Sequence, residues 1–304
     1  MRLISSLVLT ALVAPASAQE PVSAPTLNRA QQEGVLEAIR ERVREDYVFT
    51  EVAQRADAGL GARAATLVTE EPVDLAGFIA RINAALLELT RDKHVSIRKV
   101  IPHFDKPTGR HGIERVERLK DGIGYLRVDR FFQAEESRGI FDEAMDQLAG
   151  CKAVIVDLRE NRGGGDALGL LASYFLPERV LLNKLEFRKH ESIETWAGPS
   201  TRPAFVKVPL YVLVSGRTFS AGEAFAYGLQ QRGRATLVGE RTKGGANPNQ
   251  FFPVGGGLEL SLSIGRTVNP VSGTNWEGVG IVPQVAVPAD QALEKALALA
   301  AAGR

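Results

Sequence analysis

An uninterrupted apolar run in the middle of the chain constrains the fold more than any other feature. Residues 153–156 read Ala-Val-Ile-Val and are followed by Asp157 and Leu158. A short run without polar alternation is typical of a strand buried on both faces, as in the parallel sheet of an α/β protein. The run therefore predicts an α/β core with buried strands.

The sequence around this run alternates between strand-like and helix-like segments from residue 91 to the end. The strand-like segments are 95–101, 122–128, 153–158, 210–214, 235–238 and 258–264. The helix-like segments are 136–148, 167–175, 221–231 and 290–300. This alternation predicts one α/β domain over residues 91–304.

Three amphipathic segments precede the α/β region, at 28–47, 51–65 and 74–89. In the first of them, Val35, Ile39 and Val43 recur at helical spacing on one stripe. We therefore expect a small N-terminal helical domain over residues 28–90. The preceding residues 19–27 contain two prolines and are expected to form a linker.

The first residues are expected to be a signal peptide. Arg2 is followed by an apolar run over residues 3–13 and then by Ala16-Ser17-Ala18, which fits a small-residue cleavage site. The run is too short to span a bilayer, which takes about 20 residues. We therefore expect residues 1–18 to be removed and the protein to be exported, either periplasmic or secreted, with no membrane span.

Composition narrows the possible chemistry. The chain of 304 residues carries a formal charge of +1, which argues against nucleic acid as a partner. One cysteine, Cys151, can close no internal disulfide, and four scattered histidines without paired spacing argue against a metal centre. No cofactor motif is present, so we expect chemistry from hydroxyls, carboxylates and one imidazole.

The most informative serine is Ser220. It follows a predicted strand ending at Val214 and begins the helix-like segment from Ala221. A hydroxyl at a helix start can act as a nucleophile, since the N–H of the next residue can stabilise the oxyanion that forms. The same pattern, Ser220-x-x-Glu223, also describes an ordinary capping box, which is the commoner use of such a serine.

Two other segments could complete such a site. Asn161 and Gly163 to Gly165 follow the central strand, and the glycine N–H groups could donate to an oxyanion. His94 opens a predicted strand, and a neutral imidazole can take a proton from a serine near neutral pH. Each of these segments also has an ordinary structural interpretation, as a tight turn or a surface histidine.

Taken together, these segments resemble the tail-specific, or C-terminal processing, serine peptidase superfamily, which includes the tricorn core protease and the interphotoreceptor retinoid-binding protein. Five motifs in the family's order carry the resemblance: Asp92-x-His94-x-Ser96, Asp157-Leu158-Arg159-x-Asn161-x-Gly163-Gly164, Thr218-x-Ser220-Ala221-x-Glu223, Gly239-Glu240-x-Thr242-x-Gly244-Gly245 and Glu277-Gly278-x-Gly280-Ile281-x-Pro283. They span about residues 90–290.

The resemblance implies a fold and a set of roles. The fold would be a crotonase/ClpP-like ββα spiral core behind the helical domain. Ser220 would be the nucleophile and His94 the general base, acting on peptide or protein substrates through an acyl-enzyme. The oxyanion donors would be Ala221 and either Gly163 or Gly164. Glu277 would act on the other side of the site, with Ser96 and Asn161 in support.

This sequence also departs from parts of the family. Relatives of the lysine type pair the serine with a lysine where this chain has Gly245, which leaves the histidine type. Tricorn-like members have a serine directly before the histidine where this chain has Lys93, so either Ser96 or Glu277 could orient His94. The segment between Ile97 and Gly122 is too short for the PDZ domain that many relatives insert.

Two other functions stay open at this point. The retinoid-binding relative implies that the same fold can carry hydrophobic ligands without catalysis. The same acyl-transfer groups could also hydrolyse small esters or amides. The sequence does not determine the oligomeric state.

Overall fold

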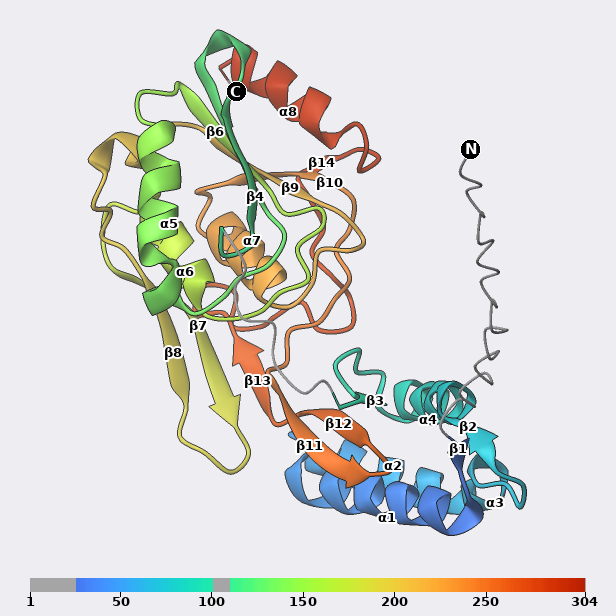
Figure 1. The fold of residues 1–304 in the computed structure, drawn as a ribbon. Helices are drawn as coiled ribbons and strands as arrows, with labels where there is room; N and C mark the ends of the chain where they lie inside the picture. The colour runs from blue at the N-terminus through green and yellow to red at the C-terminus, as the bar shows by residue number, and fades with distance from the viewer. Residues whose placement is uncertain (1–25, 101–109, 304) are drawn as a thin grey trace, which may run out of the picture.

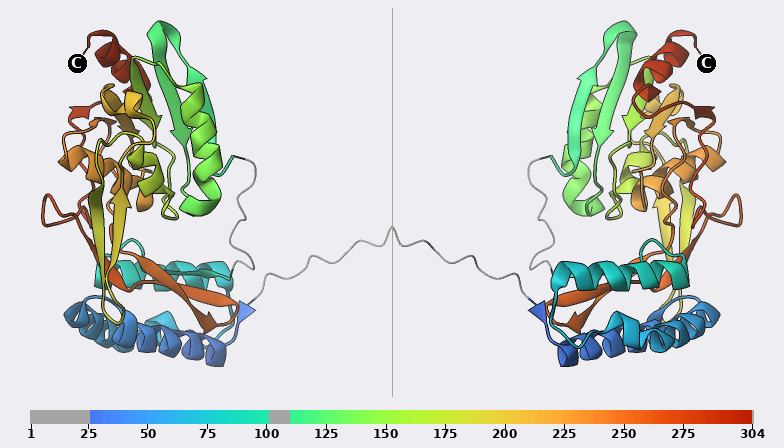
Figure 2. Two further views of the ribbon diagram at one scale, coloured as in Figure 1. Left: turned by 90° about the vertical axis from the view of Figure 1, so that its left-hand side faces the viewer. Right: turned by 90° about the vertical axis from the view of Figure 1, so that its right-hand side faces the viewer.

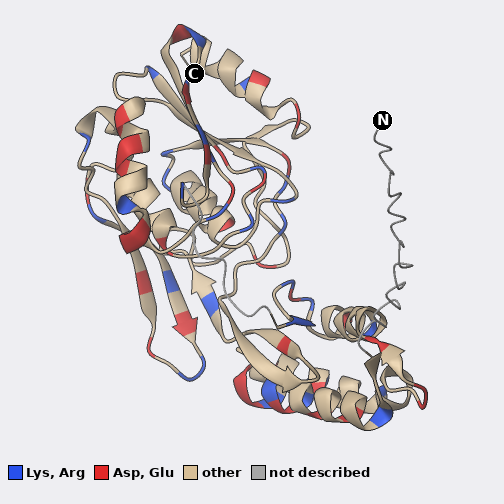
Figure 3. Cartoon of the chain, in the orientation of Figure 1, with Lys and Arg blue, Asp and Glu red and all other residues tan. Residues whose placement is uncertain are grey.

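The computed structural model describes residues 26–100 and 110–303, so the predicted signal peptide (1–18) and most of the predicted linker lie outside the described residues. The chain forms a larger body around a six-stranded sheet and a smaller body of N-terminal helices with a three-stranded sheet (Figures 1 and 2). Basic and acidic residues are interspersed along the described parts of both bodies (Figure 3). Among the described residues, no helix is both long and apolar enough to cross a bilayer.

The six-stranded sheet confirms the predicted α/β class. From one edge to the other its strands are β14 (Val285–Ala286), β10 (Thr236–Gly239), β9 (Leu210–Val214), β6 (Ala153–Asp157), β5 (Ile123–Val128) and β4 (Ile113–Arg118). All neighbours are parallel except β4, which is antiparallel to β5. The apolar run over residues 153–156 lies in β6, near the middle of this sheet.

Helices cover both faces of the sheet, which explains why β6 is buried throughout and apolar over residues 153–156. Val154 and Val156 pack in one hydrophobic cluster with α5 (Ala134–Gln147), α6 (Ala167–Ser173) and α7 (Ala221–Gln231). Ile155 packs on the opposite face, in a second cluster with α8 (Ala292–Ala301).

The smaller body contains the predicted N-terminal helices. These are α1 (Arg29–Asp46), α2 (Thr50–Ala62), α3 (Ala64–Leu67) and α4 (Leu75–Thr90). They share one hydrophobic cluster with a sheet of β11 (Asn249–Gly255), β12 (Leu258–Ser263) and β3 (Ser96–Lys99). The core of the helical region therefore continues past residue 90 and includes a hairpin from much later in the chain.

The sequence prediction missed strands β4, β11 and β14 and two further sets of paired strands. Thr26 and Leu27, expected in the linker, form β1 and pair with β2 (Val73–Asp74). A second three-stranded sheet contains β13 (Gly265–Val268), β7 (Val180–Phe187) and β8 (Ile193–Ala197). Two short 3-10 turns, Lys120–Gly122 and Pro203–Val206, complete the described elements.

The loop between β7 and β8 connects the two bodies. Arg188 donates hydrogen bonds to the carbonyl oxygens of Arg44 and Tyr47, and Lys189 forms an ion pair with Asp46 at 2.7 Å. These contacts hold the end of α1 against the larger body. The seam between the bodies is where the candidate site lies.

Candidate active site

Ser220 lies in a strained turn between β9 and α7. Its backbone has φ 53° and ψ −118°, a positive φ that is rare for residues with a side chain. The turn is fixed on both sides of Ser220, since Phe219 N–H donates to the Asn161 carbonyl at 3.0 Å and Gly222 N–H donates to the Phe219 carbonyl at 3.0 Å. Strained residues held by their surroundings cluster at functional sites.

A buried carboxylate joins this turn to the neighbouring loop. Glu223 is fully buried and accepts the Ser220 N–H at 3.0 Å, the Thr242 hydroxyl at 2.5 Å and the N–H groups of Gly244 and Gly245 at 2.7 and 2.9 Å. Burial raises the pKa of Glu223, while these donors pull it down. Glu223 therefore does more than cap the helix, because it fixes the 242–245 loop against the serine turn.

The glycine loop after β6 lies directly beside Ser220. Strands β6 and β9 are parallel neighbours, with Asp157 opposite Leu213, so the segments that follow them leave the sheet at the same edge. A side-chain carbon placed on Gly163 would lie 2.7 Å from Ser220 Cβ and 3.1 Å from Ala221 N. Only glycine fits this position, which also has φ +95°.

Two backbone N–H groups, one following Ser220 and one in the adjoining glycine loop, make no hydrogen bond within the described chain. Gly163 N–H donates to Asn161 Oδ1 at 2.8 Å, whereas the N–H groups of Gly164 and Ala221 have no acceptor among the described residues. Asn161 is itself held by the Val128 carbonyl at 2.9 Å. Of the two glycines proposed from the sequence, Gly164 has a backbone N–H without an acceptor. Gly163, by lacking a side chain, lets the glycine loop pack closely against Ser220.

His94 comes from the other body, in the connection between α4 and β3. Its side chain is 7% exposed, and its ring packs on Phe219 with centroids 4.4 Å apart. A side-chain carbon on Gly245 would lie 2.8 Å from His94 Cε1, so the absence of a side chain there leaves room for the imidazole. The imidazole is therefore buried against the residue that precedes Ser220.

The imidazole makes no hydrogen bond in the described structure. Neither ring nitrogen has a partner, and Nδ1 lies 4.0 Å from Asp92 Oδ1. Burial lowers the pKa of His94; the Asp92 carboxylate partly opposes this shift and the Lys243 ammonium adds to it. The ring is thus kept neutral at neutral pH, the form that can accept a proton.

Asp92 is the nearest acid to the imidazole, and the sequence reasoning gave it no role of its own. It is buried, and its Oδ1 accepts the His94 backbone N–H at 2.9 Å. Its Oδ2 accepts the Tyr47 hydroxyl and the Asn247 amide, both at 3.2 Å. The signal that could have identified it was its place two residues before His94.

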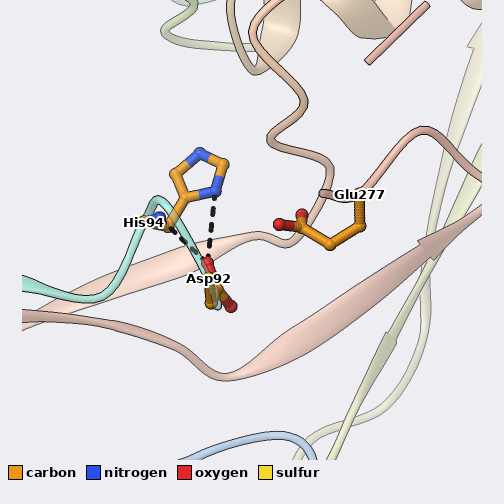
Figure 4. Close-up of side chains that lie close together, drawn as sticks. All are labelled: Asp92, His94 and Glu277. Carbon is orange, nitrogen blue, oxygen red and sulfur yellow. Dashed lines mark hydrogen bonds and ion pairs between the residues drawn. The ribbon is translucent and has the colours of Figure 1, made fainter. Parts of the chain in front are cut away.

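Glu277 lies beside these two residues, on the loop after β13 (Figure 4). Its Oε2 accepts the N–H groups of Ala246 and Asn247 at 2.6 and 3.0 Å, and its Oε1 is buried without a partner among the described residues. Burial, reinforced by the Asp92 charge, raises the pKa of Glu277 to about 7. Glu277 therefore faces the acid and imidazole side of the site.

Ser96, the other residue proposed to orient His94, lies in β3 opposite Ser261 and has no hydrogen bond to His94. Ser261 instead donates to the His94 carbonyl at 2.5 Å. Lys93 donates to the Lys243 carbonyl, and the Lys243 ammonium lies 4.5 Å from the centre of the Phe219 ring. Both lysines therefore lie on the rim of the site.

These parts are those that a serine nucleophile needs for acyl transfer: a strained serine at a helix start, available N–H donors and a neutral imidazole. Residues 122–287, more than half of the chain, match the model of peptidase family S41. The chain belongs to this family, and the resemblance drawn from its motifs is confirmed.

Individual relatives agree with this assignment. The chain is 28% identical over 204 residues to a carboxyl-terminal-processing protease of Picosynechococcus, a match covering 66% of this chain and 45% of the relative. It thus spans less than half the length of that relative. A putative peptidase from Parabacteroides merdae shares the fold with a TM-score of 0.66, 21% identity and coverage of 89% and 96%. The tricorn protease shares it with a TM-score of 0.57, 14% identity and coverage of 87% and 35%.

Proposed function

We propose that the protein is a serine peptidase in which Ser220 is the nucleophile and His94 the general base. The observation that carries this proposal is the pair of available N–H groups, on Ala221 and Gly164, beside a serine in a strained turn. A purely capping serine would not need this pair. Stabilisation of an oxyanion does require it.

The mechanism follows from the roles that these groups can take. Nδ1 of His94 faces Asp92, which leaves Nε2 as the nitrogen that takes the Ser220 proton. Ser220 Oγ then attacks the peptide carbonyl, and the N–H groups of Ala221 and Gly164 donate to the resulting oxyanion. His94 returns the proton to the leaving amine, and water hydrolyses the acyl-enzyme.

Asp92 and Glu277 act as positioning residues in this proposal. Each carboxylate is held by hydrogen bonds from other parts of the chain and stabilises the imidazolium that forms when His94 takes a proton. This arrangement favours Asp92 over Ser96 as the residue that orients the ring. Asn161 supports the glycine loop.

Peptides or proteins are the proposed substrates, because the curated relative is named for processing carboxyl termini. We also propose that the protein acts after export, from the apolar segment and Ala16-Ser17-Ala18 at its N-terminus.

Labelling with a fluorophosphonate and cleavage of an unstructured peptide test the proposal together. We expect labelling of Ser220 in the wild-type protein, loss of labelling and cleavage in Ser220→Ala, and no change in the control Ser192→Ala, whose serine is exposed. Labelling with ester hydrolysis but no peptide cleavage would make it a small-substrate hydrolase. A folded protein that neither labels nor cleaves would contradict the proposal and favour a carrier of hydrophobic ligands.

A further inference from the structure

Three buried or half-buried side chains meet behind the imidazole: Asp92, His94 and Glu277. One nitrogen or oxygen atom from each lies within 4.8 Å of the other two. Figure 4 shows Nδ1 of His94 turned toward Asp92 and the Glu277 carboxylate pointing toward both. A single acid beside the histidine would suffice to stabilise the imidazolium, so the second acid leaves room for a further role.

The polar atoms in this cluster are incompletely paired. Both nitrogens of His94, whose side chain is 7% exposed, lack a partner among the described residues, as does the buried Glu277 Oε1. Buried polar groups without partners are rare in native proteins and call for an explanation, such as a bound ion. Two carboxylates beside an unpartnered imidazole offer a cation three ligand atoms at once.

The donor set selects the kind of cation. One imidazole nitrogen with two carboxylate oxygens suits zinc, whereas calcium and magnesium prefer oxygen ligands alone. Three protein ligands leave a fourth position for water, as in open zinc sites. Ligands about 2.1 Å from zinc lie ~3.4 Å apart in a tetrahedral site, so the side chains need to close by roughly an ångström or slightly more.

The groups around the cluster already orient two of the ligands. Tyr47 and Asn247 donate to Asp92 Oδ2, which leaves Oδ1 on the side of the imidazole. The N–H groups of Ala246 and Asn247 hold Glu277 Oε2, which leaves Oε1 available. Such outer contacts normally orient metal ligands and tune their affinity.

We propose that Asp92, His94 and Glu277 bind a zinc ion and that zinc switches off the proposed peptidase. The regulatory part rests on the proposed function. Neutral imidazole bound to zinc through Nδ1 carries its proton on Nε2. It then donates at Nε2 and cannot accept the Ser220 proton. The spacing of the histidines in the sequence argued against a metal centre. It could not reveal this site, because the proposed ligands come from segments 92–94 and 277 rather than from paired histidines.

Metal binding is tested in the full chain with Ser220→Ala, which keeps all three ligands and needs no activity. We expect one equivalent of Co²⁺ to give the visible absorption of a tetrahedral site and Zn²⁺ to displace it. Added to that background, His94→Ala and the near-isosteric Glu277→Gln should each weaken Zn²⁺ binding at least tenfold, with unchanged circular dichroism. The control His190→Ala removes an exposed histidine and should leave binding unchanged. No stoichiometric binding, or equal weakening by His190→Ala, would overturn the site.

Regulation is tested in the wild-type protein by the rate of fluorophosphonate labelling. We expect Zn²⁺ to slow labelling at least tenfold over the concentrations at which it binds, and a chelator to restore the rate. Unchanged labelling of zinc-loaded protein would overturn the regulatory part. Absence of labelling even without zinc would overturn the proposed function, while the binding titration still decides the metal site.

Discussion

The two halves of the site are built in different ways. On the serine side, Glu223 receives four hydrogen bonds, and the Asn161 side chain holds both the glycine loop and a strand end. On the histidine side, the imidazole makes no hydrogen bond, and its acid stands 4.0 Å away. The first half belongs to one sheet edge, whereas the second lies where two bodies meet.

This difference indicates that the proposed oxyanion donors are preformed, while the proposed base is the adjustable part. Donors fixed before reaction contribute most to stabilising a developing charge, because they need no reorganisation. Catalytic hydrogen bonds of a base are often long in the resting state and shorten in the substrate complex. Substitutions on the serine side and on the histidine side should therefore have distinguishable effects on turnover and stability.

The largest effect is expected from His94→Ala. Losing the base should lower turnover of a peptide on the order of 10⁴-fold or more, as for other serine hydrolases. The thermal unfolding midpoint should fall modestly, because the buried ring loses its packing on Phe219 but no hydrogen bond. Steady-state kinetics and calorimetry measure both. Retention of more than a tenth of the activity would show that another group is the base.

Gly163→Ala should be the next most damaging substitution, this time on the preformed side. The added carbon would lie 2.7 Å from Ser220 Cβ, at a backbone position with φ +95°, and must displace the nucleophile. We expect turnover to fall by about 10²–10³, the effect of losing an oxyanion donor. The matched control is Gly139→Ala, in the exposed face of α5, where nothing lies within 4 Å. Equal rates for the two variants would contradict the preformed turn.

Asp92→Asn distinguishes the contribution of Asp92 from that of Glu277 on the histidine side of the site. The substitution removes the charge nearest Nδ1 and should lower turnover by about 10- to 100-fold, less than for an acid in direct hydrogen-bond contact. Glu277→Gln should cost less, because Gln keeps an oxygen for the N–H groups of Ala246 and Asn247. The ratio of kcat values measures the difference. A larger loss in Glu277→Gln would make Glu277 the orienting acid.

Glu223→Gln should have the smallest effect on turnover and a visible effect on stability. The new amide group brings a donor to a buried site where all four neighbours are donors. One unsatisfied buried group should cost about 2 kcal/mol in the free energy of unfolding. Denaturant unfolding measures this loss. An unchanged midpoint would mean that the 242–245 loop is held by other contacts.

The sequence predicted the helix and the central strand on the serine side well, because each of these elements is local. The helix was expected over 221–231 and is Ala221–Gln231, since its start follows a buried strand and a capping pattern. The apolar run at 153–156 likewise predicted β6 and the loop that leaves it. These features depend on neighbours within a few residues, which periodicity and turn chemistry can reveal.

The histidine side was predicted less completely because it depends on contacts between distant segments. Asp92 is held by Tyr47 and Asn247, which are 45 and 155 residues away in the chain. No local pattern contains that information. The β7–β8 hairpin was missed for a related reason: most of its residues are half-buried or exposed, so its strands lack the alternation of a one-sided sheet.

A crystal structure of the fluorophosphonate adduct tests the central contrast most directly. We expect a phosphoryl oxygen within about 3 Å of both Ala221 N and Gly164 N, with the serine turn unmoved. We also expect Nε2 of His94 to move to within hydrogen-bond distance of Ser220 Oγ. A phosphoryl oxygen away from both N–H groups, or an imidazole still without a partner, would contradict this expectation.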